Sequence, residues 1–442
     1  MNTPLLLLLF LLAAASMLGL LLGTLTGLVP GFHPNNVAVI LLSFSPLLIA
    51  EPHGLTASIP AEYIPLLIAA VILAASVAHT FLNFLPAAFI GAPEEDTALA
   101  LLPAHQLLLE GRAYEATALS AIGSFGAVIC SFVLFMPFYL LFASIHLYEL
   151  LRGAMFYLLL AISVLLILTE SFSERMEPRK AILLSSAFFV ISGSFGLVIL
   201  NLPYHAPLPL PSTLLFPALT GLFGLATILF ALLHTPELPE QRIVEPAIDR
   251  ASLLKSVSAG SIFGMLVSFL PGITTAHATV LAMLARRDRD PEQVIVTLSS
   301  VNTADVFFCL GTLFLIARAR SGTTIAISRL LDLQLWTHFT LPPTSLLYLL
   351  IVILVTAPFS YFLTRYLGKQ FALHFRNLPY RALLSGIALF LMLLVFLFTG
   401  FIGLLTLLVG TCIGLIPIVV GIRRSTAMGV LLLPILVMLW HM

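Results

Sequence analysis

The chain has 442 residues, of which 9% are charged and 60% are apolar, and its formal net charge is zero. Soluble domains carry about 25% charged residues, so this composition excludes a water-soluble globule and indicates a multi-pass membrane protein. The balanced charge and the lack of a Lys/Arg-rich tract argue against a nucleic acid as partner. The three cysteines lie far apart inside apolar runs, which predicts neither a disulfide framework nor a metal site.

Apolar segments recur along the whole chain and predict an all-α integral membrane protein with about 10–12 transmembrane helices. In chain order they lie at about 5–29, 63–85, 113–145, 153–169, 181–200, 212–233, 252–270, 293–317, 341–364, 382–400, 401–421 and 425–441. A barrel would need short alternating strands, which the pattern lacks. The first segment has neither a basic start nor a small-x-small cleavage site, so we expect it to be retained as a membrane helix.

Basic residues in the loops predict the orientation of the spans in the cell membrane. Loops 171–180, 235–255 and 365–381 each contain Lys and Arg, and cytoplasmic loops are enriched in both. Segments 51–62 and 201–211 contain neither residue. We therefore expect the first three loops to be cytoplasmic and the last two segments to face outward.

Two segments in different halves of the chain match each other. Residues 19–42 read GLLLGTLTGLVPGFHPNNVAVILL and residues 260–284 read GSIFGMLVSFLPGITTAHATVLAML, so a shift of 241 positions aligns their Pro-Gly breaks. Because Lys and Arg flank only the second copy, the pair predicts inverted-topology repeats, each with a Pro-Gly-broken re-entrant hairpin. The predicted parts are a first membrane repeat at 1–234, a cytoplasmic linker at 235–245 and a second, inverted membrane repeat at 246–442. Two unrelated Pro-kinked helices are the alternative interpretation.

The breaks also predict an anion site. Pro lacks an amide hydrogen and Gly permits unusual backbone angles, so each helix must break there. The half-helix that follows points its first N–H groups and the positive end of its dipole at the break. The candidate substrate-binding residues are Gly31, His33, Asn35, Asn36, Asn83, Gly272, Thr274, Thr275, His277, Asn302, Thr303 and Arg320. The alternative is that Asn and Thr only cap their own half-helices.

Ionisable residues inside or beside the spans need a separate interpretation. Asp305 lies within an apolar run, where an ionised carboxylate is costly, so we predict that it binds a coupling ion, sodium or a proton. A salt bridge to a nearby arginine is the alternative. Arg318 and Arg320 follow at a span end predicted to be external, where they either face an anionic substrate or anchor the span. The other histidines, including His79, lie near segment boundaries, which predicts interfacial positions.

Five stretches carry a family resemblance. They read GTLTGLVPGFHPNNVA, FIGAPEEDTALALLPAHQLLLEGRAYEATALSA, PALTGLFGL, LGTLFLIARARSGTTIAI and GLIPIVVGIRRSTAMGVLLLP. On these stretches the chain resembles the large membrane subunit of tripartite tricarboxylate transporters, and more closely its stand-alone archaeal relatives. The resemblance implies a secondary transporter of small carboxylates. The chain departs from the bacterial pattern at 93–98, PEEDTA, in place of a small-residue Ala-Thr run followed by Asp-Gly, so a tricarboxylate specificity is not implied.

These observations favour a secondary active transporter of a small organic anion of the carboxylate class. It would work by alternating access, driven by a sodium or proton gradient and without a cofactor. The alternative is a polyprenyl-phosphate translocase, because the paired breaks are also similar to those of membrane proteins proposed to flip that lipid carrier. An intramembrane lipid-phosphate hydrolase is a third hypothesis, but no enzyme motif or ATP-binding loop occurs, so we do not expect an enzyme. Homo-oligomers, a soluble binding protein and a small membrane subunit remain open as partners.

Overall fold

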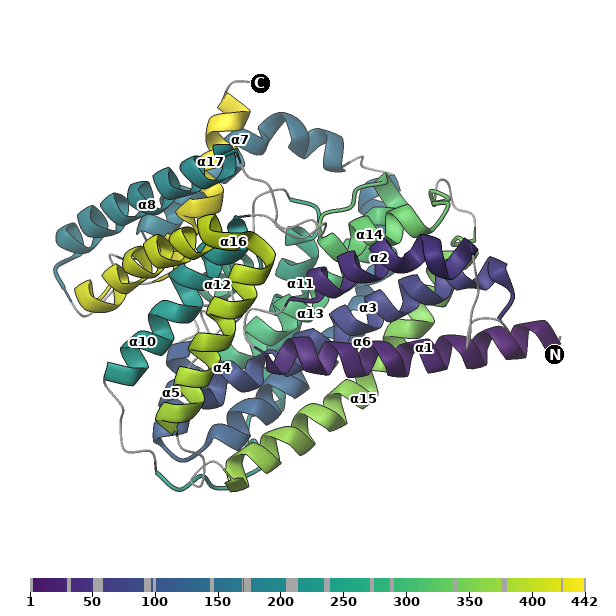
Figure 1. Ribbon diagram of the computed structural model, residues 1–442, viewed down its shortest axis with the longest axis horizontal. Coiled ribbons are helices and arrows are strands. Elements are labelled where there is room, and N and C mark those ends of the chain that lie inside the picture. The colour runs from purple at the N-terminus through teal and green to yellow at the C-terminus, as the bar shows by residue number, and fades with distance from the viewer. Residues whose placement is uncertain are drawn as a thin grey trace.

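The computed structural model describes residues 3–29, 33–50, 59–90, 97, 101–143, 147–168, 170, 176–203, 214–233, 239–270, 274–286, 290–336, 341–374, 380–422 and 424–440 (Figure 1). Before the linker the helices are α1 (Thr3–Leu28), α2 (Pro34–Ala50), η2 (Ala61–Tyr63), α3 (Ile64–Leu82), α4 (Phe84–Ile90), α5 (Leu101–Leu109), α6 (Ala113–Ala143), α7 (Leu147–Leu168), α8 (Pro178–Asn201), α9 (Leu215–Leu219), η5 (Thr220–Leu225) and α10 (Ala226–Leu233). After it come α11 (Arg250–Val267), α12 (Thr275–Arg286), α13 (Pro291–Ile316), α14 (Gly322–Leu330), α15 (Thr344–His374), α16 (Tyr380–Val420), η7 (Arg424–Met428) and α17 (Gly429–Trp440).

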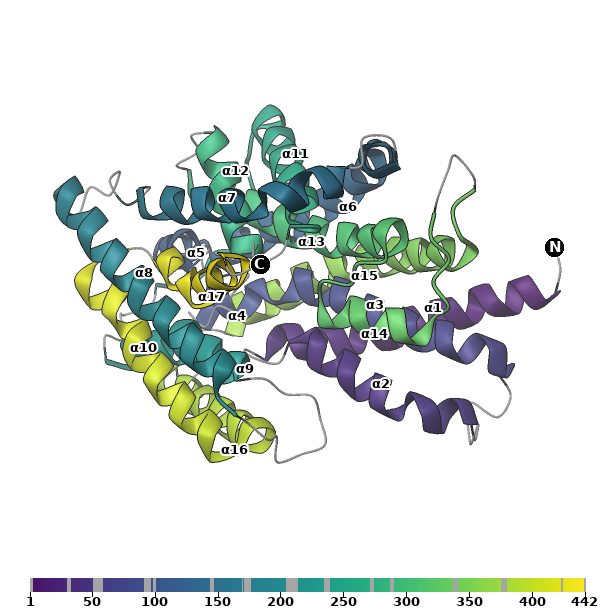
Figure 2. The same cartoon turned by 90° about the horizontal axis from the view of Figure 1, so that it is seen from above.

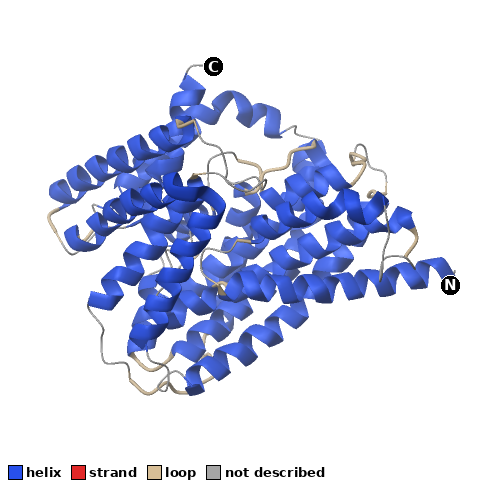
Figure 3. Cartoon of the chain, in the orientation of Figure 1, coloured by secondary structure: helices blue, strands red, loops and turns tan. Residues whose placement is uncertain are grey.

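Every regular element in the described residues is a helix (Figure 3), which confirms the predicted all-α class. Eight of the helical segments described are long and apolar enough to cross a membrane. Three further apolar helices, Pro34–Ile49, Gly153–Leu168 and Thr426–Trp440, are shorter. The apolar pattern therefore located the spans correctly, while the predicted 10–12 crossings exceed the eight helices that meet the length requirement.

The helices form two groups at opposite ends of the molecule. Figures 1 and 2 place α1, α2, α3, α14 and α15 at one end and α8, α10 and α16 at the other, with α13 between them. Each group combines helices from before and after the linker. The two halves of the sequence therefore interdigitate and share one structure.

Helices α3 and α13 are the most buried of the long apolar helices in the described residues. Nearly every side chain of α3 from Ile68 to Leu82 and of α13 from Val294 to Leu315 is buried. Helix α3 packs against α1, α2, α14 and α15, whereas α13 packs against α6, α11 and α12. A membrane helix that is covered on all sides by protein can carry polar side chains, because none of them has to face lipid.

Helices α1 and α11 approach these two helices through glycine. A Cβ added at Gly19 of α1 would lie 2.5 Å from Ala74 Cβ, and one added at Gly260 of α11 would lie 2.5 Å from Ser300 Cβ. The residues met are Val71, Ala74 and Ala75 on α3, and Thr297, Ser300 and Val301 on α13, each pair separated by 226 positions. Small residues spaced four apart let membrane helices pack closely. The segments that match in sequence thus make the same contact with their partner helices.

Helix α16 in the second group is not straight. At Gly400 the backbone leaves helical geometry, with φ 63° and ψ −156°, a region that glycine adopts without strain. The apolar pattern predicts separate segments at 382–400 and 401–421, which meet at this glycine. The part of α16 after Gly400 crosses the π-helical turn η5 closely. A Cβ added at Gly414 would lie 2.3 Å from the Leu222 carbonyl oxygen, so this position has no room for a side chain.

The predicted linker is tied to the first half of the chain. Residues 239–249 have no regular structure. The Arg242 N–H donates to the Gly111 carbonyl oxygen over 2.7 Å, and Gln241 Oε1 accepts from the Ala113 N–H over 3.1 Å. Beside this contact, Arg112 pairs with Glu292 at the start of α13 over 2.6 Å. These bonds hold the start of the second half against the α5–α6 turn.

Candidate functional site

His33, Asn35 and Asn36 lie together at the start of α2, where the sequence predicted an anion site. The His33 carbonyl oxygen accepts from the Asn36 N–H over 2.9 Å, and His33 Nδ1 accepts from the Asn35 N–H over 3.2 Å. His33 therefore occupies the capping position of this half-helix. Gly31 lies outside the described residues, as do the acidic residues of the PEED stretch.

Asn35 connects α2 to α14, a helix from the other half of the chain. Its Oδ1 accepts from the Thr323 N–H over 3.2 Å, and a Cβ added at Gly322 would lie only 2.9 Å from the Asn35 side chain. The start of α14 is also capped by Ser321, which forms a capping box with Thr324. Asn35 therefore caps the N-terminus of α14, whereas the capping alternative predicted that it would cap its own half-helix.

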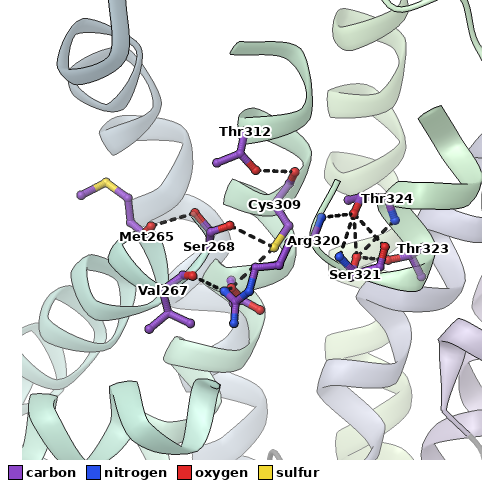
Figure 4. A network of polar contacts seen from close by, with 10 residues as sticks. Met265, Val267, Ser268, Cys309, Thr312, Arg320, Ser321, Thr323 and Thr324 are labelled. Atoms are coloured by element: carbon purple, nitrogen blue, oxygen red, sulfur yellow. Dashed lines mark hydrogen bonds and ion pairs between the residues drawn. The ribbon is translucent and has the colours of Figure 1, made fainter. Parts of the chain in front are cut away.

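Asp305 and Arg320 form an ion pair at the junction of α11, α13 and the segment before α14. Arg320 Nη1 donates to Asp305 Oδ1 over 3.1 Å and also to the Val267 carbonyl oxygen. The side chains are 17% and 19% exposed, respectively. Around the pair, the Cys309 thiol contacts Asp305 Oδ1 over 3.6 Å and the Ser268 carbonyl oxygen over 3.7 Å (Figure 4). The salt bridge that was the alternative interpretation of Asp305 is thus present.

Polar side chains also meet where α3 and α13 touch. The Thr80 and Thr303 hydroxyls lie 3.1 Å apart, and both residues are buried. Asn302, beside Thr303, is 3% exposed. Asn83 is 2% exposed, and neither of its amide atoms has a hydrogen-bond partner in the described part of the chain. A buried amide without partners costs free energy, so it is typical of a position that hydrogen-bonds a ligand, an ion or water.

Thr274 and Thr275 lie at the start of α12, in the second copy of the repeat. The Thr274 carbonyl oxygen accepts from the Ala278 N–H over 3.1 Å, so the α12 helix begins directly after the predicted break. Thr275 is buried. Gly272 and the side chain of His277 lie outside the described residues. The start of α12 therefore has the position predicted for it, and the hydrogen bonds described leave its anion-binding role a prediction.

His79, which the sequence did not single out as a candidate site residue, lies within the apolar span Ala61–Phe89. It is 1% exposed, and its Nδ1 lies 3.1 Å from Thr26 Oγ1 on α1. Its ring centroid lies 5.2 Å from that of His33. The available signal was helical spacing, because His79 lies one turn before Asn83, which the sequence did single out.

The described residues contain no group of three His, Cys, Asp or Glu side chains that could hold a metal ion. What they contain is a partly buried ion pair, two histidines, several hydroxyls and amides, and the starts of α2 and α14. Such an arrangement can bind an anion through N–H groups and Arg320 and a small cation or proton through Asp305.

The long apolar helices of the described residues define a multi-pass membrane protein. Residues 13–429 match the Tripartite tricarboxylate transporter TctA family, and the chain belongs to this family. The predicted resemblance is therefore confirmed, and the chain belongs to a transporter family rather than to an enzyme family. An uncharacterized protein of the archaeon Methanocaldococcus jannaschii is 33% identical over 315 residues, which are 71% of each chain. No solved structure matches the chain.

Proposed function

We propose that the protein is a secondary active transporter of a small organic anion of the carboxylate class. It works by alternating access and is driven by a sodium or proton gradient. The observation that carries this proposal is the largely buried Asp305–Arg320 pair in a chain of the TctA family. Burying an ion pair inside a membrane protein costs free energy, so such a pair is a candidate functional site.

The pair couples anion and cation through charge. An anionic substrate that takes the Arg320 guanidinium leaves the Asp305 carboxylate without its positive partner. A largely buried carboxylate cannot stay ionised alone, so a proton or a sodium ion must neutralise it. Binding of the anion and binding of the cation therefore favour each other, which is the requirement for coupled transport.

The predicted substrate ligands fit around this pair. The starts of α2 and α12 supply N–H groups, with Gly31, Gly272 and His277 as further ligands at the two breaks. Asn83 supplies a buried amide, and Asn302 and Thr303 supply the wall from α13. Hydrogen bonds from amides and hydroxyls to an anion are charge-assisted, and each is worth about 1.5–3 kcal/mol.

The inverted-repeat organisation belongs to the same proposal. It divides the chain at 1–234, 235–245 and 246–442, with re-entrant hairpins at 19–42 and 260–284. The equal contacts of Gly19 with α3 and Gly260 with α13 support it. In alternating access the two repeats move relative to each other around the shared site.

The test uses full-length protein in liposomes loaded with unlabelled succinate, malate or citrate. The wild type exchanges at least one of these for external radiolabelled anion, and Asn35→Ala, Thr274→Ala and Arg320→Gln each slow exchange. For the first two, loss of one hydrogen bond to a charged ligand lowers affinity about 10- to 100-fold. Asn201→Ala, which changes an exposed asparagine of α8, is the matched control.

Two outcomes would contradict the proposal. In the first, exchange and protein yield fall by the same factor in the Asn35 and Thr274 variants, which would leave capping as their role. In the second, no carboxylate exchanges while a polyprenyl phosphate in the membrane is translocated, which would favour the lipid carrier as substrate.

A further inference from the structure

Two of the five stretches that carry the family resemblance, PALTGLFGL and GLIPIVVGIRRSTAMGVLLLP, contribute no residue to the proposed transport site. The structure brings them together in the second helix group, where the part of α16 after Gly400 crosses η5 (Figure 1). A Cβ added at Gly410 would lie 2.9 Å from the Ala218 carbonyl oxygen, and one added at Gly414 would lie 2.3 Å from that of Leu222. A shift of 192 positions therefore aligns the two segments, which run in the same direction.

Arg424 connects the same two segments just beyond their crossing. It lies in η7, after the end of α16, and its Nη1 donates to Thr227 Oγ1 on α10. The Thr227 hydroxyl in turn donates to the Phe223 carbonyl oxygen, inside the π-helical turn η5. Thr227 is 5% exposed, and Arg424 is half-buried. A chain of two hydrogen bonds therefore holds the Arg424 guanidinium against α10.

The direction of the Arg424 side chain is opposite to that of an ordinary interfacial arginine. Arginines near the end of a span extend their charged group toward water. Thr227, by contrast, lies six residues before the end of the span Leu215–Leu233, which is about 9 Å along a helix. The guanidinium therefore reaches back into the membrane region.

The contacts of Arg424 do not neutralise its charge. Arg112 and Arg365 each form ion pairs with glutamates, whereas the partner of Arg424 in the described residues is a hydroxyl. An arginine stays protonated in proteins, and a guanidinium presents five N–H donors. A positive charge that is partly removed from water is unfavourable without a negative partner, so an anion at this position stabilises it.

The surface at the depth of this contact faces lipid. Val419, which the shift of 192 positions places level with Thr227, is 75% exposed, and Leu233 at the end of α10 is 77% exposed. Arg424 lies at the end of the span that α10 shares with the basic loop 235–255, the side predicted to be cytoplasmic. Basic positions between membrane helices on this side bind the phosphate groups of anionic lipids. A soluble anion would have to leave water to reach the guanidinium, whereas a lipid phosphate already lies in the membrane interface.

We propose that Arg424 binds the phosphate group of an anionic membrane lipid, whose acyl chains pack on the exposed apolar side chains of α10 and α16. Thr227 is a positioning residue that orients the guanidinium. The bound lipid neutralises the charge and stabilises the contact of η7 with α10. This site shares no residue with the Asp305–Arg320 pair, so the inference goes beyond the proposed transport function and does not depend on it.

The experiment measures lipid binding by purified full-length protein in detergent. Phosphatidylglycerol, phosphatidylcholine, inorganic phosphate and succinate are added in separate titrations, and the rise in melting temperature reports binding. Phosphatidylglycerol should stabilise the wild type more than phosphatidylcholine does. In Arg424→Gln the apparent affinity for phosphatidylglycerol should fall about 10- to 100-fold, because the lost contact is to a charged group. Arg179→Gln removes an exposed arginine at the start of α8, in the same helix group, and should keep the wild-type affinity.

Equal affinity of the wild type and Arg424→Gln for phosphatidylglycerol would overturn the inference. Stabilisation of the wild type by inorganic phosphate or succinate, and not by phosphatidylglycerol, would also overturn it, because the anion would then be a soluble one. If Arg424→Gln is poorly folded, Thr227→Val decides. This variant removes the hydroxyl that positions Arg424, so its affinity for phosphatidylglycerol should fall, while Thr227→Ser restores it. Wild-type affinity in Thr227→Val would overturn the inference.

Discussion

Asp305 lies inside a span and pairs with Arg320, which is the salt bridge that the sequence left as the alternative to binding of a coupling ion. A paired carboxylate is not excluded from transport, because the pair can open when an anion competes for the arginine. In the proposed function the ion pair therefore contributes both to the stability of the resting state and to the coupling of anion and cation. The substitutions that separate these two contributions are isosteric ones.

Asp305→Asn removes the charge and retains the shape of the side chain. We expect gradient-driven accumulation to be lost while exchange persists, since anion binding no longer requires a neutralising cation. Arg320 then lacks its partner, and the loss of stability should lie between the about 1 kcal/mol of an exposed pair and the about 3–5 kcal/mol of a fully buried one. Thermal unfolding and vesicle uptake measure the two effects. Unchanged gradient-driven uptake in a well-folded variant would eliminate the coupling role.

Asn83 offers a test in which stability and function move in opposite directions. Its amide is buried without partners in the described residues, so Asn83→Leu removes an unsatisfied polar group of similar size. We expect the free energy of unfolding to increase by about 1–3 kcal/mol and the melting temperature to rise with it, while exchange of carboxylate falls. The exposed Asn201→Leu should change neither. A destabilised Asn83→Leu protein with normal exchange would show that the amide is structural.

At this scale the sequence identified residue types better than their partners. Asp305 and Asn83 stand out because polar residues in apolar runs are conspicuous. The bond from Thr323 to Asn35 joins residues 288 positions apart, which no local pattern contains. His79 was assigned to the interface because segment ends are usually exposed, whereas α1 and α15 cover the end of α3.

The helix pairs α1–α3 and α11–α13 depend on glycine at their contacts. Gly264→Ala would put a Cβ 2.6 Å from the Val301 carbonyl oxygen and 2.8 Å from Ala304 Cβ, distances that require α11 to move away. Since overpacking typically costs about 1–3 kcal/mol, we expect a lower melting temperature and slower exchange. The control is Gly386→Ala on α16, where an added Cβ meets nothing within 4 Å. Equal behaviour of the two variants would contradict the close packing of α11 on α13.

Element boundaries could be predicted wherever backbone chemistry fixes them. The break at Gly400 was visible as the boundary of two apolar segments, and the start of α12 follows a Pro-Gly pair. The π-helical turn η5 was not predicted, because the TGLFGL sequence of this turn is as apolar as its flanks. Its geometry comes from the close crossing with α16, a tertiary contact.

The orientation of the whole molecule is testable without a substrate. In a background without Cys130, Cys309 and Cys412, single cysteines at 51–62 and 201–211 should react with a membrane-impermeant reagent outside intact cells. Cysteines at 171–180 and 235–255 should react only after the membrane is opened, because basic loops stay in the cytoplasm. Labelling at 235–255 from outside intact cells would contradict the predicted inverted topology.

The membrane class and the family could be predicted from composition and five sequence stretches, since a chain this poor in charge and this rich in long apolar runs cannot cover its surface with polar groups in water. The arrangement of the two helix groups could not be predicted, because it depends on which apolar face meets which. Apolar faces that are all rich in Leu and Ile carry no pairing information in their sequence. Glycine spacing was the exception, as Gly19 and Gly260 mark the faces that meet α3 and α13.

The polar character of α13 has a consequence for biogenesis. It is the least apolar of the eight spans found in the described residues, because Thr297, Ser300, Asn302 and Asp305 all lie within it. Membrane insertion of such a segment is less favourable, since a charged residue at mid-membrane opposes insertion by about 2.5–3.5 kcal/mol. Its partners α3 and α6 precede it in the chain, so they are synthesised and inserted before α13. We therefore expect α3 and α6 to assist the membrane insertion of α13, so that α13 packs against them while it inserts.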